Sequence, residues 1–283
     1  MDKKTSLKVK YKNFSQTHDI INCMKINIAY NEKIPEYLET LRKVETELEK
    51  HNAEYKSFDI AELSDFGDFT IALGGDGTIL RTARFYSDTK IPVLGINLGR
   101  LGFLSHSEDI EYIIDSILSG NYYSEERLML SSGSFLALND FVIKGCNQSR
   151  SSKFYLEIND DVVCNYIADG IIISTPTGST AYGLSAGGPV LHPALDSIVI
   201  VPICPHTLNA RPLVVPAKEQ IAVKTNDMLL SVAIDGYDTI KCIDKITITA
   251  SDKKAVLAFL NERQFYPVLR NSLHWGVMPK KSV

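Results

Sequence analysis

The chain lacks the features that most directly mark a secreted, zinc-binding or membrane protein. Its five cysteines (Cys23, Cys146, Cys164, Cys204 and Cys242) are widely spaced and include no Cys-x-x-Cys pair, so neither a disulfide framework nor a zinc site is indicated. No apolar run reaches membrane-spanning length, and the basic first residues are not followed by the apolar core of a signal peptide. We therefore expect a cytoplasmic protein with no membrane partner.

An excess of basic residues is also absent. The formal net charge of −4 at pH 7 argues against a protein that binds nucleic acid through a broad basic field. If the ligands are polyanions, they must be held by backbone N–H groups, a few local cations and a metal ion. The length of 283 residues, with 45% hydrophobic residues, is sufficient to bury a sizeable core, and two domains are the default expectation.

Two familiar phosphate-binding motifs are missing as well. There is no Gly-x-x-x-x-Gly-Lys-Ser/Thr run. The pair Gly75 and Gly77 begins like a dinucleotide fingerprint, but Leu80 stands where the third glycine is required.

A different glycine run is present. The apolar stretch 69–73, which predicts a buried strand, is followed by Gly74, Gly75, Asp76, Gly77 and Thr78 and then by a helical pattern. Glycines between a strand and a helix N-terminus expose backbone N–H groups at the positive end of the helix dipole, which predicts a phosphate cradle. A carboxylate beside phosphates would repel them unless a cation or a substrate hydroxyl intervened, so Asp76 indicates chemistry more than binding. A tight turn with Asp76 as a helix cap is the alternative.

Strands and helices alternate on both sides of this run. Strands are predicted at 25–30, 55–58, 69–73 and 92–97, and helices beginning at Pro35 and Ile110. Such alternation predicts a parallel sheet covered by helices, with ligands bound beyond the carboxyl ends of the strands. The glycine run and a second glycine-containing loop, 97–103, should face one crevice there. Residues 1–23 are polar and weakly periodic and are expected to form a poorly structured lead.

After about Gly120 the pattern changes to short β-rich runs. Strands are predicted at 135–138, 154–158, 162–166, 171–174, 198–201, 221–224, 229–234 and 246–250, with a hairpin turn at 159–161. We therefore expect a second, mainly β domain. The tail from Lys254 has a helical pattern and is expected to return to the first domain.

A second cluster of chemically useful residues lies at 169–189. Its hydroxyls and its tyrosine form a surface suited to a nucleoside, because hydroxyls donate and accept hydrogen bonds and an aromatic ring can stack on a base. The residues concerned are Thr175, Thr177, Ser179, Thr180 and Tyr182. A Ser/Thr-rich capped turn that opens a short helix is the alternative.

Ser185 lies in a match to the Gly-x-Ser-x-Gly elbow of serine hydrolases, at residues 183–187. That elbow requires a strand directly before the serine, whereas residues 180–184 are small, polar and more typical of a helix. His192, His206 and His274 could be proposed as the base, but isolated histidines are more often structural. The hydrolase is therefore a minor alternative.

Taken together, these motifs resemble those of the NAD kinase family. The resemblance runs from Met24 to the C-terminus and is carried by the glycine run 74–78, the pair Asn139 and Asp140, Asp169-Gly170, the run 175–189, and 205–208 leading into 211–214. Asp140 stands where other members have glutamate. The glycine run alone is shared with diacylglycerol and sphingosine kinases and resembles phosphofructokinase, so the run 175–182 decides the assignment.

The resemblance implies transfer of the γ-phosphoryl group of ATP to the 2′-hydroxyl of the adenosine ribose of NAD. It implies that Asp76 is the base, that Gly74, Gly75, Gly77 and Thr78 bind phosphate, and that NAD is contacted by Phe103, Asn139, Asp140, Asp169, Thr180, Ala181, Tyr182 and Ser185. It also implies that Mg²⁺ or another divalent metal acts with ATP, although it assigns no residue of the chain as a metal ligand. It further implies a homodimer or homotetramer.

The fold implied agrees with the pattern of the residues. It is a parallel-sheet α/β domain, similar to phosphofructokinase, at 24–122 and 257–283, with a β-rich, sandwich-like NAD-binding domain at 123–256. A lipid kinase of the diacylglycerol kinase type is an alternative function, although it should not need the nucleoside-like second cluster. A non-catalytic nucleotide sensor is another, although it has no evident need for Asp76.

Overall fold

A computed structural model describes residues 24–99, 102–106, 109–146, 151–206, 209–225, 229–262 and 265–273. The expected lead 1–23, His274, residues 207–208 of the family motif and residues 100–101 of the second glycine loop lie outside the described residues. The described chain divides into two compact units. The first holds the described residues up to Ala83, Ile91–Glu125 and those from Val256, and the second holds Arg84–Lys90 and Glu126–Ala255. The domain limits read from the sequence stay a prediction.

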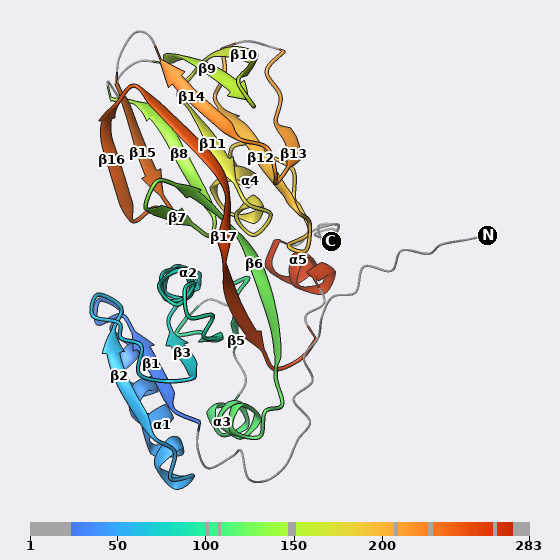
Figure 1. The fold of residues 1–283 in the computed structure, drawn as a ribbon. Helices are drawn as coiled ribbons and strands as arrows, with labels where there is room; N and C mark the ends of the chain where they lie inside the picture. The colour runs from blue at the N-terminus through green and yellow to red at the C-terminus, as the bar shows by residue number, and fades with distance from the viewer. Residues whose placement is uncertain are drawn as a thin grey trace, which may run out of the picture. The chain divides into compact units, whose positions relative to one another are not determined.

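The first unit is built on a parallel sheet (Figure 1). Its strands are β1 (Ile26–Tyr30), β2 (Tyr55–Asp59), β3 (Phe69–Leu73), β4 (Val93–Ile96) and the short β5 (Ser105–His106). They pair in the order β5-β4-β3-β1-β2, and every pair is parallel. The carboxyl ends of β3 and β4 are neighbours, because Leu73 pairs with Ile96. The two glycine-containing loops therefore leave the same edge of the sheet.

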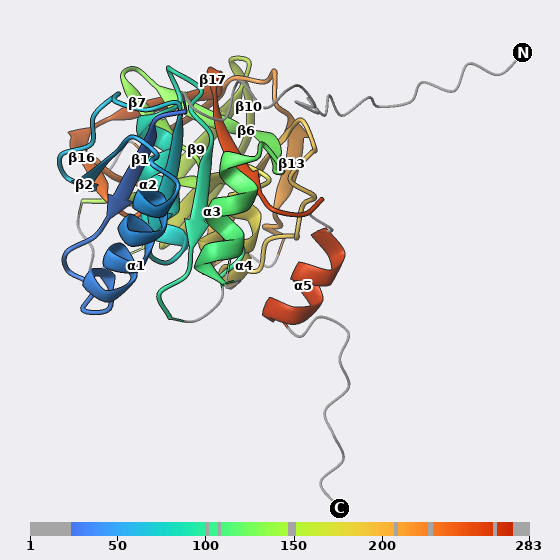
Figure 2. The same ribbon diagram turned by 90° about the horizontal axis from the view of Figure 1, so that it is seen from below.

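Helices cover both faces of this sheet. Helices α1 (Tyr37–Lys50) and α3 (Ile110–Leu118) pack side by side on one face, where Val44 and Ile113 join the core formed by β1, β3 and β4 (Figure 2). Helix α2 (Asp76–Phe85) packs on the other face. A Cβ added to Gly95 would lie 2.1 Å from Cδ1 of Ile79, so α2 approaches the backbone of β4 more closely than a side chain would permit.

The second unit is a sandwich of antiparallel sheets. One sheet has the order β13 (Leu213–Pro216), β12 (Ser197–Ile203), β11 (Gly170–Ser174), β8 (Asp140–Gly145), β15 (Leu230–Ile234) and β16 (Asp238–Ile243). The other contains β10 (Asp161–Ala168), β9 (Ser152–Ile158), β14 (Ile221–Thr225) and the first part of β17 (Lys245–Phe259), with β6 (Tyr123–Ser132) and β7 (Phe135–Ala137) beside it. Alternate side chains of both sheets, such as Phe141 and Leu156, form one core. The predicted α/β fold with a β-rich, sandwich-like part is thus confirmed.

The hairpin predicted at 159–161 is also confirmed. Ile158 and Asp161 pair at the ends of β9 and β10, and the two residues between them, Asn159 and Asp160, have φ of +51° and +68°. Two positive φ values in a two-residue turn match the twist of a hairpin, and asparagine and aspartate tolerate them better than most residues.

The expected helix from Lys254 is wrong. Residues up to Phe259 continue β17, Leu257 pairs in parallel with Val93 of β4, and a helix, α5 (Phe265–Leu273), begins only later. The segment 255–260 is apolar and buried throughout. A strand buried on both faces loses the alternation that identifies strands, so its pattern is indistinguishable from that of a buried helix.

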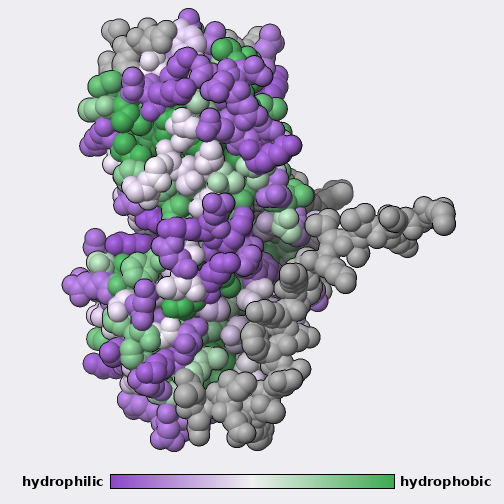
Figure 3. Space-filling model, in the orientation of Figure 1, coloured by the Kyte–Doolittle hydropathy of each residue, from purple (hydrophilic) through white to green (hydrophobic). Residues whose placement is uncertain are grey.

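On the face shown in Figure 3, hydrophilic and hydrophobic side chains are interspersed. Within the described part of the chain, no helix has the length and apolar character needed to cross a membrane.

Candidate functional site

The glycine run forms the turn between β3 and α2, and its glycines have a structural cause. The N–H of Gly74 donates to the carbonyl of Ile96 at 3.0 Å, and a Cβ at Gly74 would lie 2.4 Å from Oγ1 of Thr78. A side chain at this position would therefore displace the first turn of the helix. By contrast, a Cβ at Gly75 would meet nothing within 4 Å, so this part of the loop is open. Thr78 itself is buried, and its N–H donates to the carbonyl of Gly75 at 3.0 Å.

Asp76 is the first residue of α2 and holds the second glycine-containing loop. Its Oδ2 accepts from the N–H of Phe103 at 2.8 Å, and its Oδ1 accepts from the N–H of Leu104 at 3.0 Å. A Cβ at Gly102 would lie 2.2 Å from Oδ1 of Asp76, so only glycine permits this approach. The two loops expected to face one crevice thus meet at this carboxylate. Asp76 is half-buried, and each carboxylate oxygen can accept more than one hydrogen bond, so it can also accept from a ligand.

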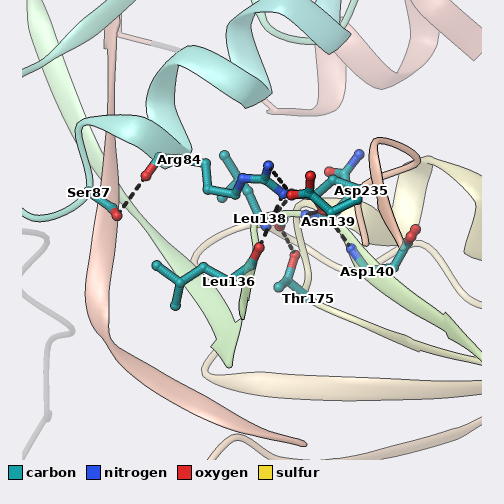
Figure 4. Close-up of polar contacts among 9 residues, drawn as sticks. Arg84, Ser87, Leu136, Leu138, Asn139, Asp140, Thr175 and Asp235 are labelled. Atoms are coloured by element: carbon teal, nitrogen blue, oxygen red, sulfur yellow. Dashed lines mark hydrogen bonds and ion pairs between the residues drawn. The ribbon is translucent and has the colours of Figure 1, made fainter. Parts of the chain in front are cut away.

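Asn139 and Asp140, at the start of β8, are held by a carboxylate that the sequence analysis did not identify. Asp235 accepts from three successive backbone N–H groups, those of Leu138 at 2.9 Å, Asn139 at 2.7 Å and Asp140 at 3.1 Å (Figure 4). The N–H of Asp235 in turn donates to the carbonyl of Asp140 at 3.0 Å. This aspartate therefore fixes the path of the chain through the pair.

The run 174–178 holds the same pair from the other side. The N–H of Thr175 donates to the carbonyl of Asn139 at 2.9 Å, and the hydroxyl of Thr175 donates to the carbonyl of Leu138 at 2.6 Å. A Cβ at Gly178 would lie 2.3 Å from the carbonyl oxygen of Asn139. The structure thus brings together the two motifs that the sequence placed far apart, at 139–140 and 175–182.

The chain continues from this contact into the residues expected to meet NAD. A 3₁₀ turn, η1 (Gly178–Thr180), leads into the short helix α4 (Tyr182–Ser185). Thr180 and Ala181 are half-buried, Ser185 is exposed, and the Tyr182 side chain is 40% exposed. An exposed aromatic ring is available for stacking on a base.

Three of the four hydroxyls expected to face a nucleoside are buried instead. They belong to Thr175, Thr177 and Ser179. The hydroxyl of Ser179 donates to the carbonyl of Pro176 at 2.7 Å and accepts from the N–H of Leu191 at 2.9 Å. Small hydroxyl side chains satisfy backbone groups in a tight turn, so here the capped-turn alternative describes them better.

Ser185 does not form a hydrolase elbow. It is the last residue of a helix that begins at Tyr182, and no strand leads into it. The strained strand-to-helix turn that the elbow requires is therefore missing at this serine.

Among the NAD contacts predicted in the second unit, Asp169 alone lies far from the others. It is exposed and directly precedes β11, whereas Thr175 directly follows that strand. At the usual rise per residue, the two positions are about 20 Å apart along β11.

Burial perturbs two aspartates at this contact, Asp140 of the 138–140 segment and Asp235 of the turn between β15 and β16. Desolvation, with a smaller contribution from the charge of Asp235, raises the pKa of Asp140 from 3.8 to about 7. Burial also raises the pKa of Asp235, but its three backbone donors and Arg84 act in the opposite direction. Those donors and Arg84 favour the carboxylate form of Asp235.

Asp235 and Arg84 are the residues that sequence reasoning missed. Asp235 precedes Gly236 in the turn between β15 and β16, and their φ values are +47° and +73°. Asp-Gly is an ordinary hairpin signal, so nothing local marks Asp235 as a partner of a segment about a hundred residues away. Arg84, in the last turn of α2, resembles any basic residue near a helix C-terminus.

Comparison with known proteins places the chain. The sequence model of the ATP-NAD kinase N-terminal domain matches residues 3–122, and that of the ATP-NAD kinase C-terminal domain matches residues 138–260. The first match extends into the segment 1–23, which the sequence analysis left outside the resemblance.

Individual relatives agree with these matches. An NAD kinase of Magnetococcus marinus is 42% identical over 237 residues, covering 77% of this chain and 78% of the relative. An NAD kinase of Pseudomonas fluorescens is 41% identical over 230 residues, covering 76% of this chain and 78% of the relative.

Solved structures show the same fold. The crystal structure of an NAD kinase from Archaeoglobus fulgidus in complex with ATP aligns with a TM-score of 0.75 and 28% identity, over 89% of this chain and 99% of the other. Yeast NADH kinase complexed with NADH aligns with a TM-score of 0.80 over 97% of this chain and 96% of the other, but at 21% identity this likeness shows the fold alone. The resemblance read from the motifs is confirmed, and the chain belongs to the NAD kinase family.

Proposed function

We propose that this chain transfers the γ-phosphoryl group of ATP to the 2′-hydroxyl of the adenosine ribose of NAD, giving NADP and ADP. Family membership supports the substrates, and the observation that carries the chemistry is the half-buried Asp76 in an open glycine loop. Phosphoryl transfer requires mainly positioning and charge neutralisation rather than covalent catalysis by the protein. A backbone cradle with one well-held carboxylate supplies both.

In this proposal the loop binds phosphate and Asp76 acts on the acceptor. Gly74, Gly75, Gly77 and Thr78 present the first turn of α2, where backbone N–H groups and the helix dipole favour an anion. Asp76 accepts the proton of the 2′-hydroxyl while the hydroxyl oxygen forms a bond to the γ-phosphorus of ATP. At the same time the bond between the γ-phosphorus and the leaving ADP oxygen breaks. The hydrogen bonds from Phe103 and Leu104 fix the direction of the carboxylate.

The NAD contacts are proposed to come from the residues that the family resemblance assigns to them. They are Phe103, Asn139, Asp140, Asp169, Thr180, Ala181, Tyr182 and Ser185. The contact between segments 138–140 and 174–178 supports this assignment for the second unit, because it gathers six of the eight into one neighbourhood of the chain.

A divalent metal fits this loop as a companion of ATP. Among the residues that the structure describes, no group of three or more His, Cys, Asp or Glu side chains could hold a metal ion. Mg²⁺ usually binds through one or two carboxylates, substrate phosphates and water, and Asp76 is the carboxylate that the glycine run offers. When bound, the ion would supply neutralisation of the phosphate charge.

The proposal includes a cytoplasmic homodimer or homotetramer. The cytoplasm is supported by the widely spaced cysteines. A second copy is supported by the position of Asp169 at the opposite end of β11 from the other predicted contacts, because another chain could present this carboxylate where its own chain does not.

The test is direct. The purified protein is incubated with MgATP and NAD, and NADP is measured with an NADP-specific dehydrogenase. We expect NADP formation that requires ATP and stops when the metal is chelated. Parallel reactions with NADH, polyphosphate and diacylglycerol identify the acceptor and donor. Absence of NADP alongside phosphorylated diacylglycerol would refute the proposal in favour of a lipid kinase, and binding without any transfer would favour a sensor.

A further inference from the structure

The backbone of Asn139 is fixed at both of its polar groups. Its N–H donates to Asp235, and its carbonyl accepts from the N–H of Thr175 and from the hydroxyl of Ser174 at 3.0 Å. Its neighbours Leu138 and Asp140 donate to the same Asp235 carboxylate. Successive N–H groups that converge on one anion form a nest, and here the anion is a side chain of the protein itself.

This carboxylate is almost completely withdrawn from solvent. The Asp235 side chain is 1% exposed, and Arg84 is the cation beside it (Figure 4). Nη1 of Arg84 lies 3.6 Å from Oδ2 of Asp235 and donates to the carbonyl of Leu136 at 3.3 Å, while Nη2 donates to Asp238 at 2.6 Å. The guanidinium thus joins the turn of Asp235 to the segment that precedes Asn139.

Holding a loop with a buried carboxylate is energetically unfavourable compared with holding it through apolar contacts. Desolvation of the carboxylate costs free energy, and apolar residues of similar volume often stabilise a fold as well or better. What an apolar side chain cannot do is orient three backbone N–H groups at once. The arrangement therefore favours precision in the direction of the Asn139 and Asp140 side chains over stability alone.

We propose that Asp235 is a positioning residue for NAD, which acts by holding the backbone of residues 138–140 so that Asn139 and Asp140 face the dinucleotide, with Arg84 holding Asp235 in place. This inference rests on the proposed function. Asp235 itself touches no substrate, because its side chain is 1% exposed and its oxygens already accept from three backbone N–H groups beside Arg84.

The matched pair Asp235→Asn and Asp59→Asn tests the inference. Asparagine tolerates the left-handed backbone of position 235, so the turn is kept while one acceptor oxygen becomes a donor facing an N–H group. Asp59 is a suitable control, because it also accepts from two backbone N–H groups, those of Ala61 at 2.8 Å and Glu32 at 3.1 Å. We expect Asp235→Asn to weaken NAD binding about 10- to 100-fold, as measured by calorimetry and by KM for NAD. KM for ATP should stay within about twofold in both variants, and Asp59→Asn should bind NAD like the parent.

Arg84→Gln provides a second test that does not alter the buried turn. It leaves the Asp235 carboxylate and its three backbone donors in place, so we expect a smaller rise of KM for NAD with KM for ATP unchanged. The inference is overturned if Asp235→Asn, or Arg84→Gln where the former is insoluble, binds NAD like the parent. It is also overturned if NAD and ATP affinity fall together with the thermal midpoint, because that is the signature of a merely structural role. A parent protein that neither binds NAD nor forms NADP would refute the proposed function itself, and the inference with it.

Discussion

Asp76→Asn is the substitution that best separates a catalytic carboxylate from a structural one. From the sequence, asparagine should be nearly silent for stability, because it caps helices as well as aspartate does. The structure changes that expectation. The carboxylate accepts from Phe103 through one oxygen and from Leu104 through the other, whereas a carboxamide has one oxygen and an NH₂ group that must face one of these donors. A hydrogen bond to a charged acceptor contributes about 1.5–3 kcal/mol, so for this half-buried site we expect the free energy of unfolding to fall by about 1–3 kcal/mol.

The catalytic effect should be far larger than this loss of stability. Removal of a general base costs roughly two to four orders of magnitude in turnover. Unfolding in denaturant gives the stability, and NADP formation, assayed well below the thermal midpoint, gives the rate. Asp59→Asn is the matched control, because it alters a half-buried carboxylate with two backbone donors and should lose comparable stability but no turnover.

Two results would refute this reasoning. If Asp76→Asn forms NADP at close to the parent rate, the glycine run is only a phosphate cradle. If Asp76→Asn and Asp59→Asn lose turnover in parallel, the loss reflects damaged structure rather than missing chemistry.

Three further predictions concern the second unit and the N-terminal segment. Tyr182→Ala should weaken NAD binding by about 1–3 kcal/mol if the ring stacks on a base, whereas Tyr112→Ala, at another exposed tyrosine, should leave NAD binding unchanged. If calorimetry shows that Tyr182→Ala binds NAD like the parent, Tyr182 is not part of the site. A chain that starts at Met24 should keep its fold and turnover, and loss of either would show that residues 1–23 are integral. The pKa of Asp140 rises from 3.8 to about 7 on folding, so between these pH values the folded state holds a proton that the unfolded state has released. The free energy of unfolding should therefore fall as pH rises from about 4 to about 7. Asp140→Asn should abolish up to about 4 kcal/mol of that loss. If denaturant titrations show that the free energy of unfolding depends on pH equally in parent and variant, the raised pKa does not belong to Asp140.

The parts of the fold that follow from local pattern were predictable. Strand β3 at Phe69–Leu73 and the hairpin turn at Asn159 and Asp160 were both anticipated, because their signals lie within a few residues. The glycine run was placed correctly between a strand and a helix for the same reason. The end of β17 was missed because burial on both faces removes the alternation on which such reading depends.

The same difference between local and long-range signals explains which parts of the candidate site were predicted. Local sequence singled out the run 175–182, and residue chemistry suggested that the hydroxyls of that run meet a ligand. Asn139 was identified through the resemblance to the NAD kinase family. Whether a hydroxyl faces a ligand or its own backbone depends on how tightly the turn closes, and the burial of Thr175 and Ser179 shows that most are used internally. Asp235 could not be found at all, because its role exists only once β8 and β15 pair in the folded sheet.

Solvent exposure decides which of the two loop-holding aspartates can take part in chemistry. Asp76 and Asp235 use the same device, a carboxylate that accepts from consecutive backbone N–H groups of a distant loop. Asp235 is 1% exposed and already meets three N–H groups and a guanidinium, so it has neither access to a substrate hydroxyl nor capacity to accept its proton. Asp76 is half-buried and beside the open Gly75, so a substrate can reach it. Substitution at Asp76 should therefore act mainly on kcat, and substitution at Asp235 mainly on KM for NAD, although each removes a hydrogen-bond acceptor from a loop.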